Sequence, residues 1–238
     1  MAIPAIDPYT IPQVAEPRRV DWSIEPSSCA VLVHDMQNYF VRAYDSDAEP
    51  IATALRSMAE IVAAAREAGV QIIFSAQPGD QHPLRRGLLS EFWGPGMSEG
   101  VDTEVVEGLE PQEGDIVLTK WRYSAFARTD LLQLMRQAEL DQLVITGIYG
   151  HMGCQATAVE AFMNDIKPFL VGDAIADFSR EEHAATIDFV NKRAGVVATA
   201  KEVTEAFGAA AAAPKGEAAK GEAANSDAGS YELRGALQ

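Results

Sequence analysis

The sequence predicts an α/β fold, a single doubly wound, Rossmann-like domain in which helices flank a mostly parallel sheet of five or six strands. Short apolar runs such as residues 29–33 are typical of strands that are buried on both faces of a parallel sheet. These runs alternate with amphipathic stretches such as residues 49–67, and strands that alternate with helices form parallel sheets. The length of 238 residues fits one such domain with a tail.

The periodicity of apolar residues indicates where each strand and helix lies along the chain. The expected strands are residues 29–33, 70–75, 115–119, 142–146, 168–171 and 196–199. The expected helices are residues 49–67, 131–138, 155–165 and 180–192.

Several helix ends carry their own sequence signals. Gly69 follows the first expected helix as a stop. Thr129 or Asp130 can cap the second, and Ser179 with Glu182 forms a capping box before the last.

The two ends of the chain differ in composition from the predicted domain at residues 28–207. Residues 1–27 contain five prolines, too many for a helix, and predict an extended arm that lies over the domain and can reach a neighbouring subunit. After Phe207 the composition is low-complexity and almost free of large apolar side chains. Residues 208–238 are therefore predicted to be a disordered tail or linker.

The segment of residues 77–100 is far longer than an ordinary connection between a strand and a helix. Segments of this length are usually functional or disordered. The string Phe-Trp-Gly-Pro-Gly-Met at residues 92–97 favours an ordered segment, because large apolar side chains are not expected to remain in solvent.

The net charge of −16 disfavours nucleic acid and anionic membranes as partners, because both require a basic face. A small anionic substrate is still allowed if cations gather locally, and the candidates are Arg85, Arg86, Lys120 and Arg122. Two cysteines form no disulfide framework and no zinc site, and the N-terminus has no signal-peptide pattern. We therefore expect a soluble cytoplasmic protein.

Three expected strands end at residues of a kind that can bind or react. Asp35 follows the first strand, Lys120 the third, and the glycine-rich turn of residues 147–153 the fourth. The carboxyl ends of parallel strands and the free amides of helix N-termini converge on one crevice, where open α/β sheets bind ligands. Each feature alone has an ordinary explanation as a helix cap, a solvated side chain or a turn. Together they predict a small-molecule site.

The sequence at these positions resembles the isochorismatase-like hydrolase superfamily. The resemblance is carried by residues 34–40 (His-Asp-Met-Gln-Asn-Tyr-Phe), 120–126 (Lys-Trp-Arg-Tyr-Ser-Ala-Phe) and 147–153 (Gly-Ile-Tyr-Gly-His-Met-Gly), and it covers roughly residues 1–207. Thiol members of this superfamily carry Gly-x-x-Thr-Asp-x-Cys before a helix that contains Thr-Ala.

The register of that pattern assigns different roles to two adjacent residues. Matching Gly147 to the first glycine, and Thr157 and Ala158 to the Thr-Ala pair, puts Gly153 at the nucleophile position. Cys154 comes one residue later, where we expect a small, buried, apolar side chain.

The strings also resemble the isochorismatase subfamily in particular, which lacks the nucleophilic cysteine and needs no metal or cofactor. The resemblance implies that Asp35 is the acid, that Lys120 is the family's lysine, and that Gly153 replaces the thiol. It implies substrate contacts from Gln77, Arg86, Trp93, Tyr149 and Phe40.

Members of that subfamily hydrolyse the enolpyruvyl vinyl ether of isochorismate to 2,3-dihydro-2,3-dihydroxybenzoate and pyruvate, in siderophore or other secondary-metabolite biosynthesis. A vinyl ether offers a thiolate no carbonyl, so hydrolysis starts with a proton from an acid and forms no covalent intermediate.

One alternative is the same reaction on 2-amino-2-deoxyisochorismate, giving 2,3-dihydro-3-hydroxyanthranilate in a phenazine-type pathway. Others are a thiol amidohydrolase that uses Cys154, and a scaffold that docks partner biosynthetic enzymes or a carrier protein. The resemblance also implies a homodimer.

The residues raise more specific expectations about the site. Burial favours the protonated form of Asp35 and Lys120 opposes it, and the sequence leaves open which influence is larger. Gly153 is expected to make room for the enolpyruvyl group and to leave backbone N–H groups for its carboxylate. Arg86 is expected to bind a carboxylate bidentately, and Arg122 either to reach the site or to form a structural ion pair.

Other polar residues receive structural roles. His34, His151 and His183 lack ligand spacing and are expected to have packing or surface roles rather than to bind metal. Asp173 and Asp177 are expected to cap the loop and helix that follow them. Gly150 is expected to loosen the turn or to enlarge the pocket near Tyr149, because relatives usually have alanine there.

Overall fold

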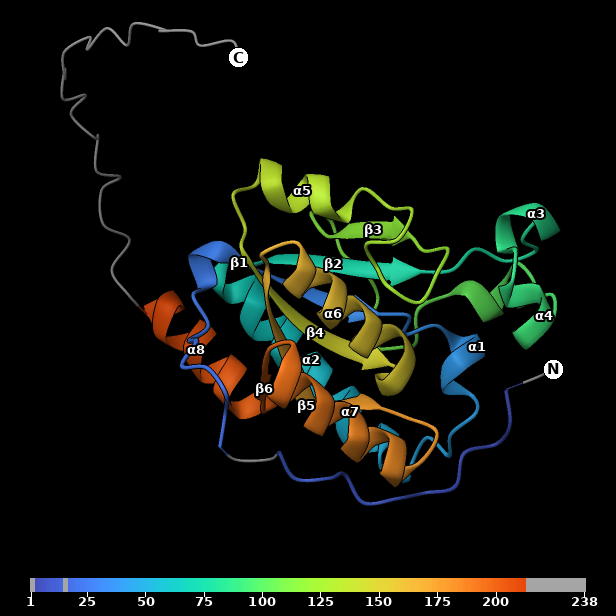
Figure 1. The fold of residues 1–238 in the computed structure, drawn as a ribbon, viewed down its shortest axis with the longest axis horizontal. Coiled ribbons are helices and arrows are strands. Elements are labelled where there is room, and N and C mark those ends of the chain that lie inside the picture. The colour runs from blue at the N-terminus through green and yellow to red at the C-terminus, as the bar shows by residue number, and fades with distance from the viewer. Residues whose placement is uncertain (1–2, 15–16, 213–238) are drawn as a thin grey trace, which may run out of the picture.

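In the computed structural model the chain forms one six-stranded sheet whose strands are all parallel (Figure 1). The structure describes residues 3–14 and 17–212. The strands are β1 (Cys29–His34), β2 (Gln71–Ala76), β3 (Ile116–Thr119), β4 (Gln142–Ile148), β5 (Lys167–Ala176) and β6 (Val196–Ala198). Their spatial order is β3-β2-β1-β4-β5-β6. The predicted fold class is confirmed, with six strands.

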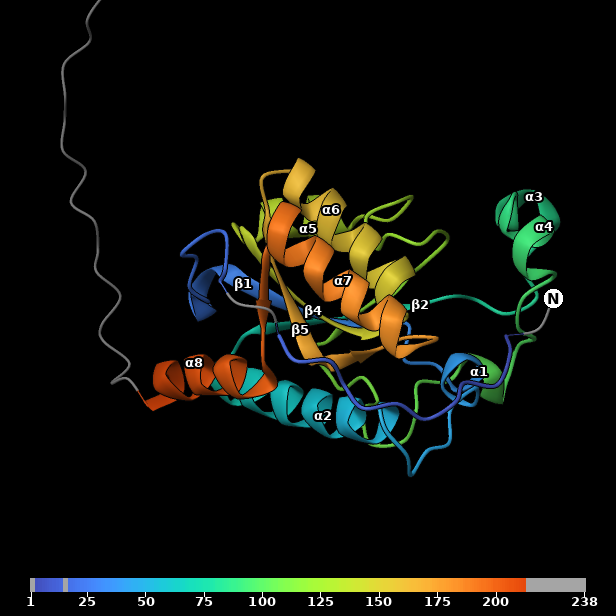
Figure 2. The same ribbon diagram turned by 60° about the horizontal axis from the view of Figure 1, so that its bottom comes forward.

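Helices cover both faces of this sheet. α2 (Ile51–Ala68) and α8 (Ala200–Ala212) pack together on one face, while α5 (Leu131–Gln137), α6 (Gln155–Met163) and α7 (Arg180–Arg193) cover the other (Figure 2). Shorter helical segments are η1 (Pro26–Ser28), α1 (Asn38–Val41), α3 (Pro83–Arg86), α4 (Leu89–Trp93), η2 (Val101–Thr103) and η3 (Gly150–Cys154). Within residues 3–14 and 17–212, no helix is both long and apolar enough to cross a membrane.

The central strand β1 shows why an apolar run predicted it. Its alternate residues Val31 and Val33 belong to the core cluster under α2 and α8, whereas Ala30 and Leu32 belong to the cluster on the opposite face. All of these side chains are buried. A strand that is covered by helices on both faces has no side on which a polar residue would reach water, so both sets of residues are apolar.

The register of β1 positions the crevice at the carboxyl end of the sheet. His34, the last residue of β1, pairs with Ser75 of β2 on one side and with Gly147 of β4 on the other. The chain moves outward from β1 to β3 and then returns to β4 on the other side of β1. Ligands bind at such a reversal of strand order. Asp35, the residue after His34, therefore stands at this crevice.

One strand runs further than the sequence predicts, and one helix, α8, has no counterpart among the predicted helices. β5 extends to Ala176, so Asp173 lies within the strand, and its carboxylate accepts a hydrogen bond from the amide of Ala200 (2.7 Å) at the start of α8. The expected cap on the following loop is therefore wrong. α8 continues to Ala212 through residues that the sequence assigned to the tail, because its alanine-rich end has high helix propensity. Residues 213–238 lie outside the part of the chain that the structure describes.

The N-terminal arm lies along the domain and reaches the carboxyl end of the sheet (Figure 1). The amides of Ile6 and Tyr9 donate to the carbonyls of Ala43 (2.8 Å) and Glu49 (3.0 Å). The Tyr9 hydroxyl accepts a hydrogen bond from the amide of Asp177 (2.8 Å), directly after β5. The arm therefore contacts segments near the crevice.

The long segment after β2 contains the two short helices α3 and α4. Met97 is buried, as expected for a large apolar side chain in an ordered segment. Phe92 is 69% exposed, so the expectation that the aromatic residues here are covered is wrong for this residue. Phe92 lies in α4, and none of the residues of this short helix is buried.

The capping box at the start of α7 allows a test of the local sequence signal. The Ser179 hydroxyl accepts a hydrogen bond from the amide of Glu182 (3.2 Å). We expect Ser179→Ala to lower the free energy of unfolding by about 1 kcal/mol in urea titrations, because one helix amide loses its partner. Ser27→Ala, at an exposed serine of η1, should change it by less than about 0.5 kcal/mol. Equal losses in the two variants would contradict the role of the cap.

Candidate active site

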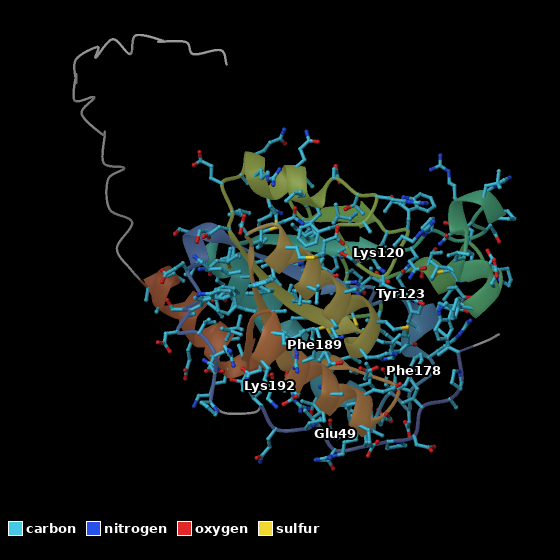
Figure 3. The ribbon with its side chains drawn as sticks, viewed as in Figure 1. Glu49, Lys120, Tyr123, Phe178, Phe189 and Lys192 are labelled. Atoms are coloured by element: carbon cyan, nitrogen blue, oxygen red, sulfur yellow. The ribbon has the colours of Figure 1, made fainter. Side chains whose placement is uncertain are left out.

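The three residues that the sequence singled out at strand ends lie together at the crevice. Asp35 follows β1, Lys120 follows β3, and Gly153 lies in the turn between β4 and α6. All three line one pocket. Figure 3 labels Lys120 and Tyr123 near the carboxyl ends of the strands.

Asp35 is fixed by its backbone and by neighbouring donors. Its φ of 51° is left-handed, a conformation that aspartate tolerates better than most residues. The hydroxyl of Ser75 donates to its Oδ1 (2.6 Å), and the side-chain amide of Gln77 donates to its Oδ2 (2.9 Å). The carboxylate is 4% exposed. Both of its oxygens are therefore oriented by groups at the end of β2.

Lys120 is held against this carboxylate and is 1% exposed. Its Nζ lies 2.9 Å from Oδ2 of Asp35. It also donates to the carbonyls of Arg122 (2.6 Å) and Tyr123 (3.1 Å). Three acceptors match the three protons of an ammonium group, which fixes the position of Nζ.

The pKa of Asp35 is set by opposing influences. Burial alone would raise the pKa of this carboxyl, but Lys120, then His34, and then the hydrogen bonds from Ser75 and Gln77 together hold it below its usual value. The sequence left open whether burial or Lys120 has the larger influence on Asp35. In the structure, Lys120 and the other neighbours together outweigh burial. The lowered pKa favours the carboxylate form of Asp35 in the unliganded site.

The turn after β4 requires glycine at two positions because it approaches His34 closely. Gly147 has a φ of 110°, and a Cβ there would lie 2.2 Å from the His34 carbonyl oxygen. A Cβ on Gly153 would lie 2.1 Å from Cε1 of the His34 ring. The space beside Gly153 is therefore filled by the imidazole of His34. The expectation that this glycine leaves room for substrate at that point is wrong.

Several amides of the turn already have acceptors within the protein. The amides of Met152 and Cys154 donate to the carbonyl of Tyr149 (3.2 and 3.3 Å), and that of His151 donates to Asp177. These three N–H groups are therefore not free to hold a substrate carboxylate. The π-helical form of η3 uses them to connect β4 to α6.

Cys154 lies outside the pocket and is completely buried, with 0% exposure. It packs in the cluster with Ala158 of α6 and Ile145 of β4. Burial raises the pKa of its thiol well above the usual value, so the thiolate is disfavoured. This is the small, buried, apolar environment that the register of the sequence predicts.

Aromatic side chains form one wall of the pocket. Phe40, Trp93 and Tyr149 line it, and Phe178 packs edge-on against Tyr149 with ring centroids 4.5 Å apart. The Tyr149 hydroxyl donates to the carbonyl of Phe40 (2.9 Å), and the Trp93 indole donates to the hydroxyl of Tyr123 (2.8 Å). These bonds fix the ring orientations.

The pocket is rich in cations although the protein is acidic. Arg86, Lys120 and Arg122 line it, and Asp35 is the carboxylate that lines it. The Nε of Arg86 donates to the Gly94 carbonyl (2.6 Å), and burial lowers the pKa of its guanidinium. Of the two expectations for Arg122, the structure supports the one in which it reaches the site. Its guanidinium is held by hydrogen bonds to the backbone carbonyls of Arg85 and Trp121.

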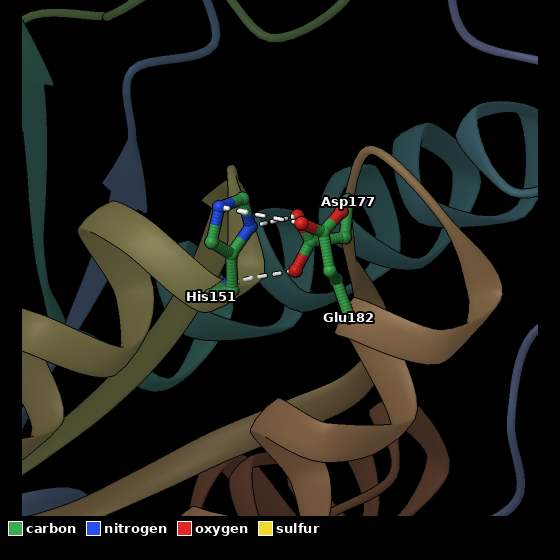
Figure 4. Close-up of side chains that lie close together, drawn as sticks. All are labelled: His151, Asp177 and Glu182. Atoms are coloured by element: carbon green, nitrogen blue, oxygen red, sulfur yellow. Dashed lines mark hydrogen bonds and ion pairs between the residues drawn. The ribbon is translucent and has the colours of Figure 1, made fainter.

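A second polar cluster ties the turn to the end of β5 (Figure 4). Asp177 accepts from both the amide and the Nδ1 of His151, and also from the amide of Phe178. A Cβ on Gly150 would lie 2.7 Å from Asp177 Oδ2, so this glycine accommodates Asp177 rather than enlarging the pocket. His151, Asp177 and Glu182 lie close enough to face a metal ion, but the Asp177 oxygens already have N–H partners.

The structure brings all eight predicted site residues to one pocket, including the five that resemblance assigned to substrate binding. It also places Arg122, a candidate cation, in the lining, and it adds residues that the sequence did not assign to the pocket: Ile3, His34, Tyr39, Leu89, Tyr123, Ile148, Met152 and Phe178. Ser75 was also missed, although a polar residue near the end of a buried strand is a usable signal. Ile3 reaches the pocket through the path of the arm, which no local pattern predicts.

The coupling between Lys120 and Asp35 can be tested by unfolding at two pH values. Asp35 stabilises the fold above its unfolded pKa of about 3.9, and this contribution is lost as the pH falls through the lower folded value. Lys120→Met leaves the buried carboxylate without its cation, so burial raises the pKa of Asp35 and the variant gains stability as the pH falls. We expect a loss of about 3–5 kcal/mol at pH 7 that shrinks at pH 5.

Lys192→Met is the matched control, because Lys192 pairs with Asp188 on the exposed face of α7. It should change the free energy of unfolding by less than about 1 kcal/mol at either pH. A loss in Lys120→Met that is the same at both pH values would contradict the coupling.

Comparisons with known proteins agree with this geometry. The family described as Isochorismatase domain matches residues 29–202. The chain is 46% identical over 196 residues to the isochorismatase of Bacillus subtilis, which covers 81% of this chain and 63% of that protein. It is 48% identical over 213 residues to phenazine biosynthesis protein PhzD1 of Pseudomonas aeruginosa, covering 85% of this chain and 99% of that protein.

A solved structure shares the fold at lower sequence identity. The cysteine hydrolase from Pseudomonas syringae pv. phaseolicola superposes with a TM-score of 0.74 at 24% identity, covering 82% of this chain and 99% of that chain. The present chain spans less than two thirds of the length of the Bacillus relative, with 63% covered. The match over residues 29–202 and the identity to these relatives show that the chain belongs to the isochorismatase family.

Proposed function

We propose that this protein hydrolyses the enolpyruvyl ether of isochorismate to 2,3-dihydro-2,3-dihydroxybenzoate and pyruvate by general acid catalysis, with no covalent intermediate. The observation that carries the proposal is the pairing of Asp35 with Lys120 in a pocket whose nucleophile position is a glycine. The name of the Bacillus relative supports the reaction class, and the name of the Pseudomonas relative supports a phenazine-type pathway.

The chemistry of a vinyl ether requires a proton at carbon before any bond to oxygen breaks. Protonation of the terminal methylene of the enolpyruvyl group gives an oxocarbenium ion. Water adds to this cation and forms a hemiketal. The hemiketal then breaks its bond to the ring oxygen, which leaves as the alcohol while pyruvate is released. The protein must therefore supply an acid and a way to restore it.

The Asp35–Lys120 pair supplies both in this proposal. At rest the proton resides on Lys120, because the pKa of Asp35 is held low. An anionic substrate displaces water from the pocket, and the lower polarity favours the neutral pair, so the proton moves from Nζ to Oδ2 across their 2.9 Å contact. Asp35 then protonates the methylene carbon. The Lys120 amine takes a proton from the water that adds, which restores the pair.

Arg86 is positioned to bind a carboxylate of the substrate. Its Nε is used by the Gly94 carbonyl, and the guanidinium lines the pocket. Within the described residues, no carboxylate forms an ion pair with Arg86, so binding an anion from solution would stabilise this buried cation. Trp93, Tyr149 and Phe40 provide an apolar surface for the ring. A small anionic substrate fits this combination.

The remaining expectations about assembly and location are also proposals. We propose a cytoplasmic homodimer that works with partner biosynthetic enzymes or a carrier protein. The net charge of −16 supports the expectation that it binds neither nucleic acid nor anionic membrane. The two cysteines are free and buried, which suits a reducing compartment.

The acid role of Asp35 is tested by measuring pyruvate with lactate dehydrogenase. The wild-type protein should release pyruvate from isochorismate, and presenting 2-amino-2-deoxyisochorismate as a competitor at equal concentration decides the ring substituent. Asp35→Asn should lower kcat by about 10²–10⁴-fold, because the amide cannot donate the proton. Asp188→Asn, at an exposed carboxylate of α7, is the control and should retain wild-type turnover. Undiminished turnover in Asp35→Asn would contradict the acid role, and no pyruvate from either compound with the wild-type protein would favour the scaffold alternative.

The thiol alternative is tested by Cys154→Ala. The thiol lies in the core rather than in the pocket, so kcat should remain within about twofold of wild type, while the free energy of unfolding falls by about 1 kcal/mol. Steady-state kinetics and urea unfolding of the same preparation measure the two effects. A loss of activity as large as that in Asp35→Asn, in a folded protein, would assign the chemistry to sulfur.

A further inference from the structure

The imidazole of His34 occupies the space in which a side chain at position 153 would begin. A Cβ built on Gly153 lies 2.1 Å from Cε1 of this ring, 2.8 Å from Nε2 and 2.9 Å from Nδ1. Real Cβ atoms do not approach other heavy atoms this closely. A nucleophilic side chain at position 153 and the present position of His34 therefore exclude each other.

The ring cannot move aside without breaking contacts, because it is enclosed. His34 is 1% exposed, and it is the last residue of the central strand β1, paired with β2 and β4 on its two sides. Nδ1 lies 2.9 Å from the carbonyl oxygen of Ile148, and Nε2 lies 3.2 Å from that of Tyr123. The ring thus spans the distance between the end of β4 and the loop after β3.

The Tyr123 carbonyl links this ring to the acid–base pair. Lys120 Nζ donates to the same carbonyl oxygen at 3.1 Å and lies 2.9 Å from Asp35 Oδ2. On its other side, His34 Nδ1 lies 3.8 Å from Asp35 Oδ1. Movement of the His34 imidazole would therefore shift the Tyr123 carbonyl, which accepts from the Lys120 ammonium. It would also change the surroundings of the Asp35 carboxylate.

We propose that His34 is a positioning residue that acts as a rigid spacer: it sets the geometry of the Asp35–Lys120 pair and requires glycine at position 153. The inference extends the proposed function, and its kinetic part rests on that function. A spacer of this kind explains why Gly153 does not enlarge the pocket where the thiol would have been. The reaction that remains available at this site is one driven by a proton rather than by a nucleophile at position 153.

The steric part is tested by thermal unfolding of four proteins: wild type, Gly153→Ala, His34→Ala and the double variant. Gly153→Ala should lower Tm by about 3–10 °C when His34 is present, because the new methyl group overlaps the ring. The same substitution should lower Tm by less than about 2 °C when His34 is alanine. Equal shifts in the two backgrounds would overturn the spacer. This measurement uses no substrate, so failure of the proposed function would not affect it.

The kinetic part is tested by pyruvate release from isochorismate. His34→Ala should lower kcat by about tenfold or more with less than about a threefold change in KM, since displaced catalytic groups reduce turnover while the binding residues remain. His34→Asn retains a donor near Nδ1 for the Ile148 carbonyl and should recover part of kcat. His183→Ala is the matched control: this histidine is also buried but does not line the pocket, so it should change Tm and leave kcat within about twofold. A kcat within twofold of wild type in folded His34→Ala and His34→Asn would overturn the positioning role.

Discussion

The contact between Lys120 and Asp35 is the interaction on which the rest of the site depends. Both groups are almost completely buried, and a buried ion pair gains little net stability, because desolvation of the two charges offsets their attraction. The pair persists because both groups have further hydrogen-bond partners: Ser75 and Gln77 donate to the carboxylate, and two backbone carbonyls accept from the ammonium. The protein thus holds a proton donor and its acceptor 2.9 Å apart beside the pocket.

The sheet assembles this pair from segments that are far apart in the sequence. The carboxyl ends of β1, β2 and β3 bring Asp35, Gln77 and Lys120 to one edge, and β4 brings the turn with Gly153 from the other side of β1. The parallel order fixes these ends more rigidly than loops could, since each strand is hydrogen-bonded to its neighbours along its length. The N-terminal arm and the segment after β2 then supply the apolar and cationic walls, including Ile3 and Arg86.

The sequence predicted the parts of the structure that depend on local periodicity. Apolar runs located all six strands because a doubly covered sheet leaves no polar side, and the residues after three of them identified the pocket. What it could not predict depends on distances between segments. The position of His34 beside Gly153 follows from the pairing of β1 with β4, and the direction of the Asp35 pKa shift follows from how closely Lys120, His34 and the hydrogen-bond donors surround it. The sequence did not predict α8, and its alanine-rich end was assigned to the tail because such a stretch has the same composition in a helix as in a linker.

The central claim is that a proton from the site is added to the methylene carbon of the substrate while the ring keeps its oxygen. Hydrolysis in deuterium oxide enriched in oxygen-18, followed by mass spectrometry of freshly formed products, measures both events at once. Proton transfer from Asp35 predicts pyruvate with a single deuterium in its methyl group, and a ring alcohol without oxygen-18. Pyruvate whose methyl group carries no deuterium, or oxygen-18 in the ring alcohol, would contradict the acid mechanism.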